Sequence, residues 1–306
     1  MGFTNYPNGF PHGVTIRGIP ILSMYPGKVW WVHSVTGGDG NPGTTPEQPF
    51  KTLDYAVCRC TAGNGDIIVC MPGHVETVVA AGGLALDVAD ICIVGLGAGS
   101  SRPTINFTTS VNADMNVDAA NISMYNILFL GGIDALVAPI DVNAADFTLT
   151  NCEYRDVTGQ ATDVILGDAN ADRLWIENYY HNGAAAAGAN SAIALNGSDN
   201  PVIKNFKIVG NFAVGAIDVR TAPVVDADIS NGYIWTKNSA DLCIIDTITT
   251  STGKIGPNLL LMLTDNAANI TEAITGATWH MFDDIFVCNL VNEKAMLINK
   301  TASTDA

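Results

Sequence analysis

Six short segments share one pattern that decides the fold: MYNILFL (124–130), LTNCEYR (149–155), IENYYHN (176–182), IKNFKIV (203–209), ISNGYIW (229–235) and GPNLLLM (256–262). The third position of every segment is an asparagine, and the sequence numbers of these asparagines rise in steps of 25, 27, 27, 26 and 27: Asn126, Asn151, Asn178, Asn205, Asn231 and Asn258. Self-similarity at a period of about 20–50 residues is typical of stacked repeats, in which each unit contacts mainly its neighbours.

The pattern around each asparagine is that of β-strands. Apolar residues alternate with period two on either side of it, as in Met124 and Phe129 around Asn126, and this period favours strand over helix. Asparagine is one of the few non-glycine residues that tolerate left-handed backbone, so we expect the chain to bend there. Stacked in successive repeats, the asparagine amides can hydrogen-bond to one another as a ladder.

A second column of residues keeps phase with the asparagines and predicts a third strand per repeat. The sequence numbers of its isoleucines rise in steps of 25, 28, 24 and 27: Ile140, Ile165, Ile193, Ile217 and Ile244. Three short parallel strands per turn of about 26 residues make a parallel β-helix. We therefore expect an all-β protein, a solenoid of about eight coils.

The segments outside the repeats suggest four regions. Residues 1–27 are punctuated by prolines and are expected to form an extended arm, with Phe10, Ile16, Ile19 and Ile21 as anchors on a partner; a loosely packed tail is the alternative. Region 28–65 contains a strand and an amphipathic helix, 52–60, which is expected to cover the open end of the β-helix at 66–276. Residues 277–306 lose the pattern and are expected to form a cap or tail.

Composition excludes several functional classes. The 306 residues carry a net charge of −16 with only 14 Lys and Arg, spread singly, so we expect no nucleic-acid binding. The sequence contains no run of about 18 apolar residues, so we expect no membrane span. At its start no charged segment precedes an apolar core, so we do not expect a Sec signal peptide. Apolar residues make up 48% of the chain and charged residues 14%, which indicates a long core or an outer surface buried against other subunits.

The opening of the chain resembles a known group of proteins. The stretch 37–78, with TPEQPFKTLDYAVCRC and NGDIIVCMPGHVETV, is similar to the N-terminal helix and first coil of pectate-lyase-like right-handed β-helix proteins. GFTNYPNGFPHGVTIRGIP, GKVWWVHS, TLDYAV and MPGHVET more closely resemble β-helix structural proteins that decorate the heads of tailed bacteriophages. The resemblance extends from the start of the chain to about position 80. It implies a right-handed β-helix, while the wider superfamily includes lyases, hydrolases, tailspikes and inert structural members.

No catalytic site is predicted from the spacing of arginines and carboxylates. The lyases of the superfamily rely on a basic residue beside acidic calcium ligands, but Arg155, Arg173 and Arg220 fall at different places in the repeat. Asp141 and Asp218 are expected to point outward, three coils or roughly 14 Å apart, which is too far for a hydrolase pair. Asp163 and Asp246 are expected to point inward or to lie at strand ends. Four further aspartates are expected in turns, where a carboxylate pair or a calcium site is the alternative to ordinary turn chemistry: Asp168, Asp172, Asp226 and Asp228.

Histidine and cysteine spacing predicts neither a metal site nor a cofactor. The five histidines show no metal-binding spacing; we expect His74 in a turn and His181 in the core. The seven cysteines form no C-x-x-C pair, and those in apolar strand patterns are expected to be reduced core residues: Cys70, Cys92, Cys152 and Cys243.

These observations favour a structural protein over an enzyme. We expect a virion protein on the capsid exterior, made in the host cytoplasm, that decorates or cements the head as a homotrimer and contacts the major capsid protein or other virion proteins. The alternative is a tailspike or another β-helix protein that binds or degrades polysaccharide. Two features favour the first interpretation: the repeats carry no long insertion, and 306 residues leave little room for the extra domains of a tailspike.

Overall fold

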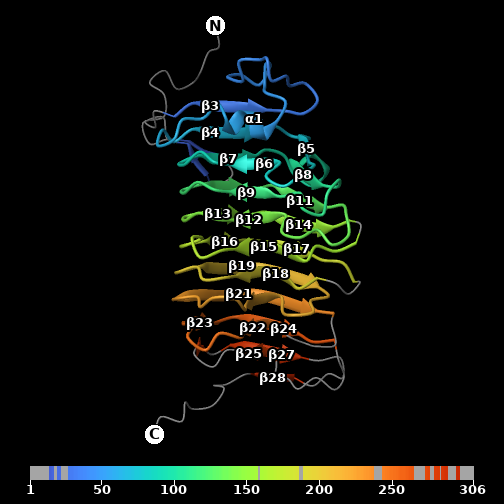
Figure 1. The fold of residues 1–306 in the computed structure, drawn as a ribbon, viewed down its shortest axis with the longest axis vertical. Helices are drawn as coiled ribbons and strands as arrows, with labels where there is room; N and C mark the ends of the chain where they lie inside the picture. Colours follow the sequence, from blue (N-terminus) through green and yellow to red (C-terminus); the bar gives the residue numbers. More distant parts are fainter. Residues whose placement is uncertain are drawn as a thin grey trace.

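The chain forms one elongated stack of parallel coils (Figure 1). The computed structural model describes residues 14–16, 19–21, 27–157, 159–185, 189–237, 243–264, 273–275, 279–282, 284–288 and 294–296. About eight turns of about 26 residues each make a parallel β-solenoid, as the asparagine period predicts. The first coils and the only helices of the described residues lie at one end of the stack, and the last strands lie at the other.

Each coil has three sides, and the strands of each side pair with those of the neighbouring coils. Side 1 contains β4 Ile67–Cys70, β7 Cys92–Gly95, β10 Ser123–Tyr125, β13 Thr148–Thr150, β16 Trp175–Glu177, β23 Gly253–Ile255 and β26 His280–Met281. Side 2 contains β5 Val75–Val78, β8 Thr104–Phe107, β11 Leu128–Gly131, β14 Glu153–Asp156, β17 Tyr180–Asn182, β24 Leu259–Met262 and β27 Ile285–Cys288. Two longer strands continue through both sides, β19 Val202–Gly210 and β21 Ala227–Thr236. Together with β3 Val29–Val32, these strands form one large parallel sheet.

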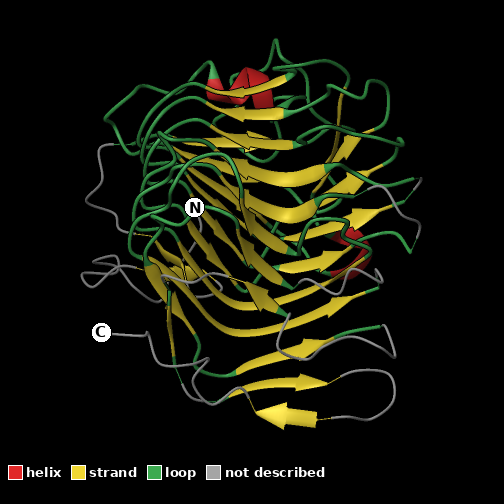
Figure 2. Cartoon of the chain, turned by 60° about the horizontal axis from the view of Figure 1, so that its bottom comes forward, coloured by secondary structure: helices red, strands yellow, loops and turns green. Residues whose placement is uncertain are grey.

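Side 3 is a separate sheet of eight strands (Figure 2). It contains β6 Leu84–Leu86, β9 Met115–Val117, β12 Ile140–Val142, β15 Asp163–Gly167, β18 Ser191–Leu195, β20 Ile217–Val219, β22 Ile244–Asp246 and β25 Ile274–Thr275. In the register of this sheet, Ile140 is aligned with Ile165, Ile193, Ile217 and Ile244 of the successive coils. The isoleucine column therefore marks the third strand of each coil, as predicted.

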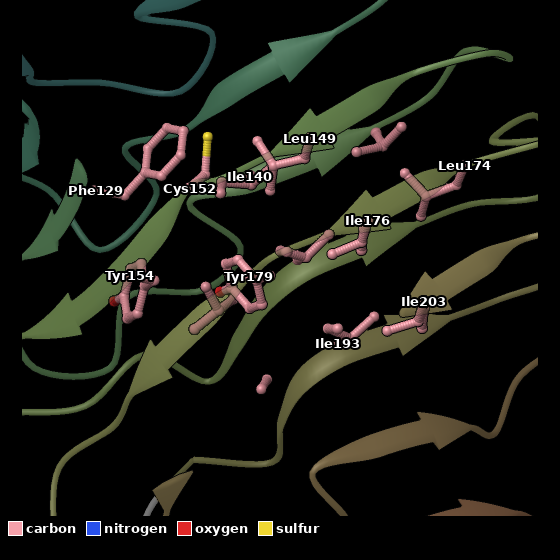
Figure 3. Close-up of a cluster of buried hydrophobic side chains, with 14 of the residues drawn as sticks. Phe129, Ile140, Leu149, Cys152, Tyr154, Leu174, Ile176, Tyr179, Ile193 and Ile203 are labelled. Atoms are coloured by element: carbon pink, nitrogen blue, oxygen red, sulfur yellow. The ribbon is translucent and has the colours of Figure 1, made fainter. Parts of the chain in front are cut away.

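The core is a set of apolar columns that run along the inside of the stack. Leu149, Ile176 and Ile203 of side 1 are in register with one another along the stack, and Ile140 of side 3 belongs to the same buried cluster (Figure 3). All four have no exposed surface. Because successive strands lie about 4.8 Å apart, each buried side chain packs on the equivalent one of the next coil. Burial of these columns is the main source of stability, since each coil cannot bury its apolar face alone.

The asparagine corner, where side 1 meets side 2, is the bend predicted at each repeated asparagine. All six asparagines have left-handed backbone, with φ from 53° to 59°. The amide ladder itself is only partly formed. Among the described residues, amide-to-amide bonds join Asn151 to Asn126 (3.3 Å) and Asn258 to Asn231 (2.9 Å). Asn205 instead donates to the Glu177 carboxylate, so the shared left-handed bend is more regular than the ladder.

A second left-handed column, which the sequence pattern did not reveal, lies where side 3 returns to side 1. Its members are chemically mixed, and their φ angles lie between 54° and 62°: Asp90, Asn121, Asp146, Arg173, Asn200 and Asp226. We call this edge the acidic corner; it comprises the turns 87–91, 118–122, 143–147, 168–174, 196–201 and 220–226. From Asn121 onward, each member precedes the asparagine of its coil by five positions, so these two bends fix the length of side 1.

The N-terminal end of the stack is covered by helix α1, Leu53–Val57. Thr52 caps this helix by accepting a hydrogen bond from the Tyr55 backbone N–H. Leu53, Ala56 and Val57 are buried in the same core cluster as the leucines of β6. The helix is shorter than the predicted 52–60, but it buries the expected face. The Glu76 carboxylate accepts from the Leu53 N–H (2.6 Å), which ties the helix to the first coil. A short 3₁₀ turn, η1 Gly99–Ser101, follows in the second coil.

The stacking continues beyond position 276 at the other end. Strands β26 and β27 pair in parallel with β23 and β24, and β28 Lys294–Met296 then pairs antiparallel with β27. Antiparallel pairing ends the parallel series on this side of the stack. In the N-terminal arm, β1 Val14–Ile16 and β2 Ile19–Ile21 form an antiparallel hairpin. No helix of the described residues is long and apolar enough to cross a membrane.

Candidate functional site

Side 3 carries one cluster of ionisable side chains on its outer surface. Ile217 points into the core, so its neighbour Asp218 in β20 points outward. Arg220, two positions later on the same surface, lies with its Nε 3.2 Å from the Asp218 carboxylate. Its Nη2 lies 2.7 Å from the carboxylate of Asp163 in β15, two coils away. Sequence spacing did not predict this grouping, because it results from one long arginine side chain spanning two coils.

Ser191 of β18 lies between the two carboxylates of this cluster. Its hydroxyl donates to the Asp163 carboxylate at 2.6 Å. Asp218 has no exposed surface, and burial raises the pKa of its carboxyl to about 6, despite the opposing effect of the Arg220 charge. The group is arranged like an acid pair with a cation, but full burial of Asp218 keeps it away from any polymeric substrate.

We expect Asp218→Asn to stabilise the protein at neutral pH. A carboxyl whose folded pKa is raised from 3.8 to about 6 contributes most to stability below pH 3.8, and this contribution is lost as the pH rises through about 6. Removing the charge should therefore raise the free energy of unfolding at pH 7 by about 1–3 kcal/mol and leave it nearly unchanged at pH 4. Urea unfolding at the two pH values measures the difference.

Asp163→Asn is the matched comparison for this measurement. It removes a carboxylate that accepts from both Ser191 and Arg220, so it should lower stability at neutral pH. A destabilised Asp218→Asn protein at pH 7 would contradict the raised pKa and would mean that the ion pair with Arg220 outweighs the cost of burying the charge.

The other acidic candidates do not join this cluster. Asp141 pairs in register with Leu166 on the outer row of side 3, and burial raises the pKa of its carboxyl, with smaller contributions from Asp114, Asp168 and Asp118. The remaining carboxylates take part in turns and strand pairs. The Asp168 carboxylate accepts from the Asn170 N–H, and the Asp172 carboxylate accepts from the Asp199 N–H. The Asp246 carboxylate accepts from the Ile248 N–H and the Trp279 ring N–H, and the Asp228 carboxylate is paired with Lys254. Asp226 is a left-handed turn residue. No group of three potential ligands among the described residues could hold a metal ion.

The predicted separation of the arginines agrees with the structure. Arg155 lies on the outer surface of side 2, beside Glu153. Arg173 lies at the acidic corner and is paired with Asp146, with Nε 2.6 Å and Nη2 2.8 Å from its carboxylate oxygens. Arg220 is the one of the three that joins two carboxylates of side 3. Its side chain is 25% exposed.

His74 lies in a turn as predicted, with its backbone N–H donating to the Met71 carbonyl after β4. Its side chain is buried, and its Nε2 lies 3.2 Å from the Glu76 carboxylate that holds helix α1. One other expectation needs correction. Cys92 points outward from side 1 and is only half-buried, whereas Cys70, Cys152 and Cys243 are buried as predicted. Burial raises the pKa of the Cys152 thiol to about 11, so this cysteine is not a nucleophile at neutral pH.

The outer surface of sides 1 and 2 carries aromatic side chains where a solvent-facing strand would carry polar ones. We call it the aromatic face and define it by Trp175, Tyr180, Lys204, Lys207, Tyr233 and Trp235, with Leu260 and Phe286 in the following coils. Leu260 and Phe286 are directly paired and are 43% and 47% exposed. Because the asparagine corner is a single-residue bend, no long turn interrupts this surface.

Lysines of the aromatic face lie over its rings. The Lys204 Nζ is 4.0 Å from the centre of the Trp175 ring and 3.6 Å from the Glu177 carboxylate. Lys207 lies between two tyrosines of adjacent coils, 5.3 Å from the Tyr180 ring and 5.7 Å from the Tyr233 ring. These are cation–π distances, each of which stabilises an exposed pair by about 0.5–1 kcal/mol.

The predicted arm anchors cannot be placed at the level of side chains. Phe10 lies outside the described residues, while Ile16, Ile19 and Ile21 lie in the β1–β2 hairpin, of which only the backbone is described.

Comparison with known proteins adds a distant structural likeness. No family model matches the chain, and no curated protein matches it. A solved structure described as "Rhamnogalacturonan lyase" is similar at 12% identity with a TM-score of 0.46, covering 89% of this chain and 90% of that chain. The strand pairing of the chain itself defines its fold as a parallel β-solenoid; a likeness of this degree carries no conclusion about activity.

Proposed function

We propose that the chain is a structural subunit that acts through protein–protein contacts, and that it decorates or cements a bacteriophage capsid, as a homotrimer on the outer surface of the particle. The observation that carries the structural part is the aromatic face. A strand that faces water alternates apolar and polar residues, whereas this surface places tryptophan, tyrosine, leucine and phenylalanine outward.

The composition of the aromatic face supports contact with a protein. Tryptophan and tyrosine are the residues most enriched in the energetically dominant parts of protein interfaces. The surface is held on paired strands, so little conformational entropy is lost when a partner covers it. The capsid as the partner rests on the resemblance of the N-terminal part of the chain to head-decorating β-helix proteins of tailed phages.

The position of the chain in purified particles tests this proposal. We expect it in capsid-only particles as well as in complete virions, accessible to antibody on the outside. Its absence from heads would exclude capsid decoration.

The contribution of the aromatic face is tested by adding Leu260→Asp protein to particles that lack the chain. Leu260 is exposed between Tyr233 and Phe286, so a carboxylate there should preserve the fold and weaken attachment at least about tenfold. Val35→Asp is the matched control: this valine is 80% exposed and lies outside the aromatic face. Equal attachment of both variants would show that attachment to the particle does not depend on the aromatic face.

A second candidate function is action on a polysaccharide, and the Asp163–Asp218–Arg220 cluster is the observation that favours it. Two carboxylates beside a cation on one outer sheet are the groups that acid–base cleavage of a glycan requires, and because Asp218 is fully buried, Asp163 and Arg220 are the two of them that a glycan could contact. Incubation with bacterial polysaccharides tests it: chain cleavage that is abolished by Asp163→Asn would establish an enzyme, and intact polysaccharide leaves the structural proposal as the account of the chain.

A further inference from the structure

Charge is distributed unequally between the acidic corner and the aromatic face. The turns of the acidic corner contain eight aspartates, Asp87, Asp90, Asp118, Asp146, Asp168, Asp172, Asp199 and Asp226, and two arginines, Arg173 and Arg220. Arg173 is paired with Asp146, and Arg220 is paired with Asp163 and Asp218 on side 3. Most carboxylates of this corner therefore have no cation to neutralise them within the part of the chain that the structure describes.

The aromatic face and its margin have the opposite imbalance. Three carboxylates of the strands on sides 1 and 2 form ion pairs: Glu153 with Arg102 and Arg155, Glu177 with Lys204, and Asp228 with Lys254. Lys207 and Lys237 remain, and no described carboxylate lies within ion-pair distance of either. Both lie beside aromatic rings, Lys237 at 5.3 Å from the centre of the Trp235 ring. This surface thus offers unpaired cations among aromatic side chains, in a chain whose net charge is −16.

The two surfaces also share one spacing. The positions that make up the acidic corner and the aromatic face recur once per coil, so both surfaces repeat at the strand separation of about 4.8 Å. Two copies of the chain placed side by side with parallel axes would therefore match coil by coil along their whole contact. Asp199, in the turn that leads into β19, lies at the level of Lys204 and Lys207 in β19 itself. An unrelated acidic protein would have no reason to share this spacing.

We propose that the aromatic face of one copy binds the acidic corner of a second copy of the same chain. The contact joins two different surfaces, so it is heterologous and closes into a ring of three or more copies. A two-fold contact would instead place Lys207 of one copy against the aromatic face of the other, with like charges opposed. The inference rests on the proposed structural function and specifies one of its contact surfaces.

The test is the oligomeric state of purified full-length chain, measured by sedimentation velocity over a range of concentrations and at low and high salt. We expect a ring of at least three copies that weakens at high salt, because exposed charges are screened. Lys207→Glu and Asp199→Lys should each raise the dissociation constant by about tenfold or more, and the double variant should recover most of the loss. Both positions are exposed, so each variant should retain the wild-type melting temperature.

Lys51→Glu serves as the matched control. It makes the same charge change at an exposed lysine outside both surfaces and should leave the assembly unchanged. A monomer at all concentrations, a two-fold dimer, or single variants that assemble like the wild type would each overturn the inference. A monomer that still attaches to capsids would overturn this subunit contact alone and leave capsid decoration intact. A ring that never attaches to heads would support the subunit contact and overturn capsid decoration.

Discussion

Asn126→Val should lower the free energy of unfolding by about 2–4 kcal/mol. The backbone of Asn126 is left-handed, with φ of 58°, and this conformation costs an ordinary residue about 1–2 kcal/mol, a β-branched one at least as much. The amide also donates to the carbonyls of Gly95 (2.8 Å) and Gly97 (3.1 Å) and accepts from Asn151. These bonds are partly exposed and contribute about 0.5 kcal/mol each, or about 1–2 kcal/mol together, and valine makes none of them. Denaturant unfolding measures the loss.

Two further variants separate the backbone contribution from that of the amide. Asn126→Gly keeps the left-handed bend at little strain and should show only the loss of the amide, about 1–2 kcal/mol. Asn178→Gly should be nearly neutral, because the amide of Asn178 makes no hydrogen bond to the described residues although its φ is 53°. If valine and glycine at position 126 were equally destabilising, left-handed backbone would not be the reason for asparagine at this corner.

The protein should lose several kcal/mol of stability as the pH falls from about 6.5 to about 3, and His181 should be a main cause. This histidine is fully buried in β17, stacked 5.3 Å from the Tyr154 ring and 5.5 Å from Phe212. Burial lowers its pKa from 6.5 to about 3. Between these values the unfolded chain binds a proton that the folded chain does not, so folding weakens as the pH falls; above pH 6.5 both states are neutral and the effect is absent.

His181→Phe should make this part of the stability profile shallower. Phenylalanine fills a similar volume among Tyr154 and Phe212 and has no proton to bind, while the lost contact from the Tyr179 hydroxyl, at 3.4 Å, is long and weak. The measurement is the urea midpoint at several pH values between about 4 and 7, the range in which the unfolded histidine titrates. Asp218→Asn, which acts in the opposite direction, is the control. An unchanged slope in His181→Phe would mean that other groups set the acid sensitivity.

The sequence predicts the fold to the level of individual strands wherever one residue type recurs. The asparagines and isoleucines show the period because each sits at a position with a single strict demand, left-handed backbone in one case and burial in the other. The acidic corner makes the same demand for left-handed backbone but meets it with Asp, Asn and Arg, so no residue type recurs and the column is visible only in the φ angles. At the acidic corner, the left-handed backbone is therefore kept from coil to coil while the residue type varies.

The candidate sites were less accessible to sequence reasoning. The Asp163–Asp218–Arg220 cluster spans two coils because an arginine side chain is long, and the repeat phase gives only the position of each Cα atom. Similarly, the alternation of side chains along a strand is enough to put Tyr180, Lys207 and Tyr233 on the outside. Their alignment in one row also requires the exact register in which β17, β19 and β21 pair. A phase error of one position would have turned all three inward.

The constant spacing of five positions between the two left-handed columns has a consequence for how such a chain can change over time. From the left-handed asparagine of one coil to the next left-handed turn residue, the step in sequence number varies from 20, between Asn126 and Asp146, to 22, between Asn151 and Arg173. All length variation among these coils thus falls between the asparagine and the next left-handed turn residue, both in the turn between sides 2 and 3 and in the turn that leads from side 3 into the acidic corner. An extra peptide inserted into the turn between sides 2 and 3 would leave the two bends and side 1 in place, so new recognition elements can be acquired there one coil at a time without disturbing the stack.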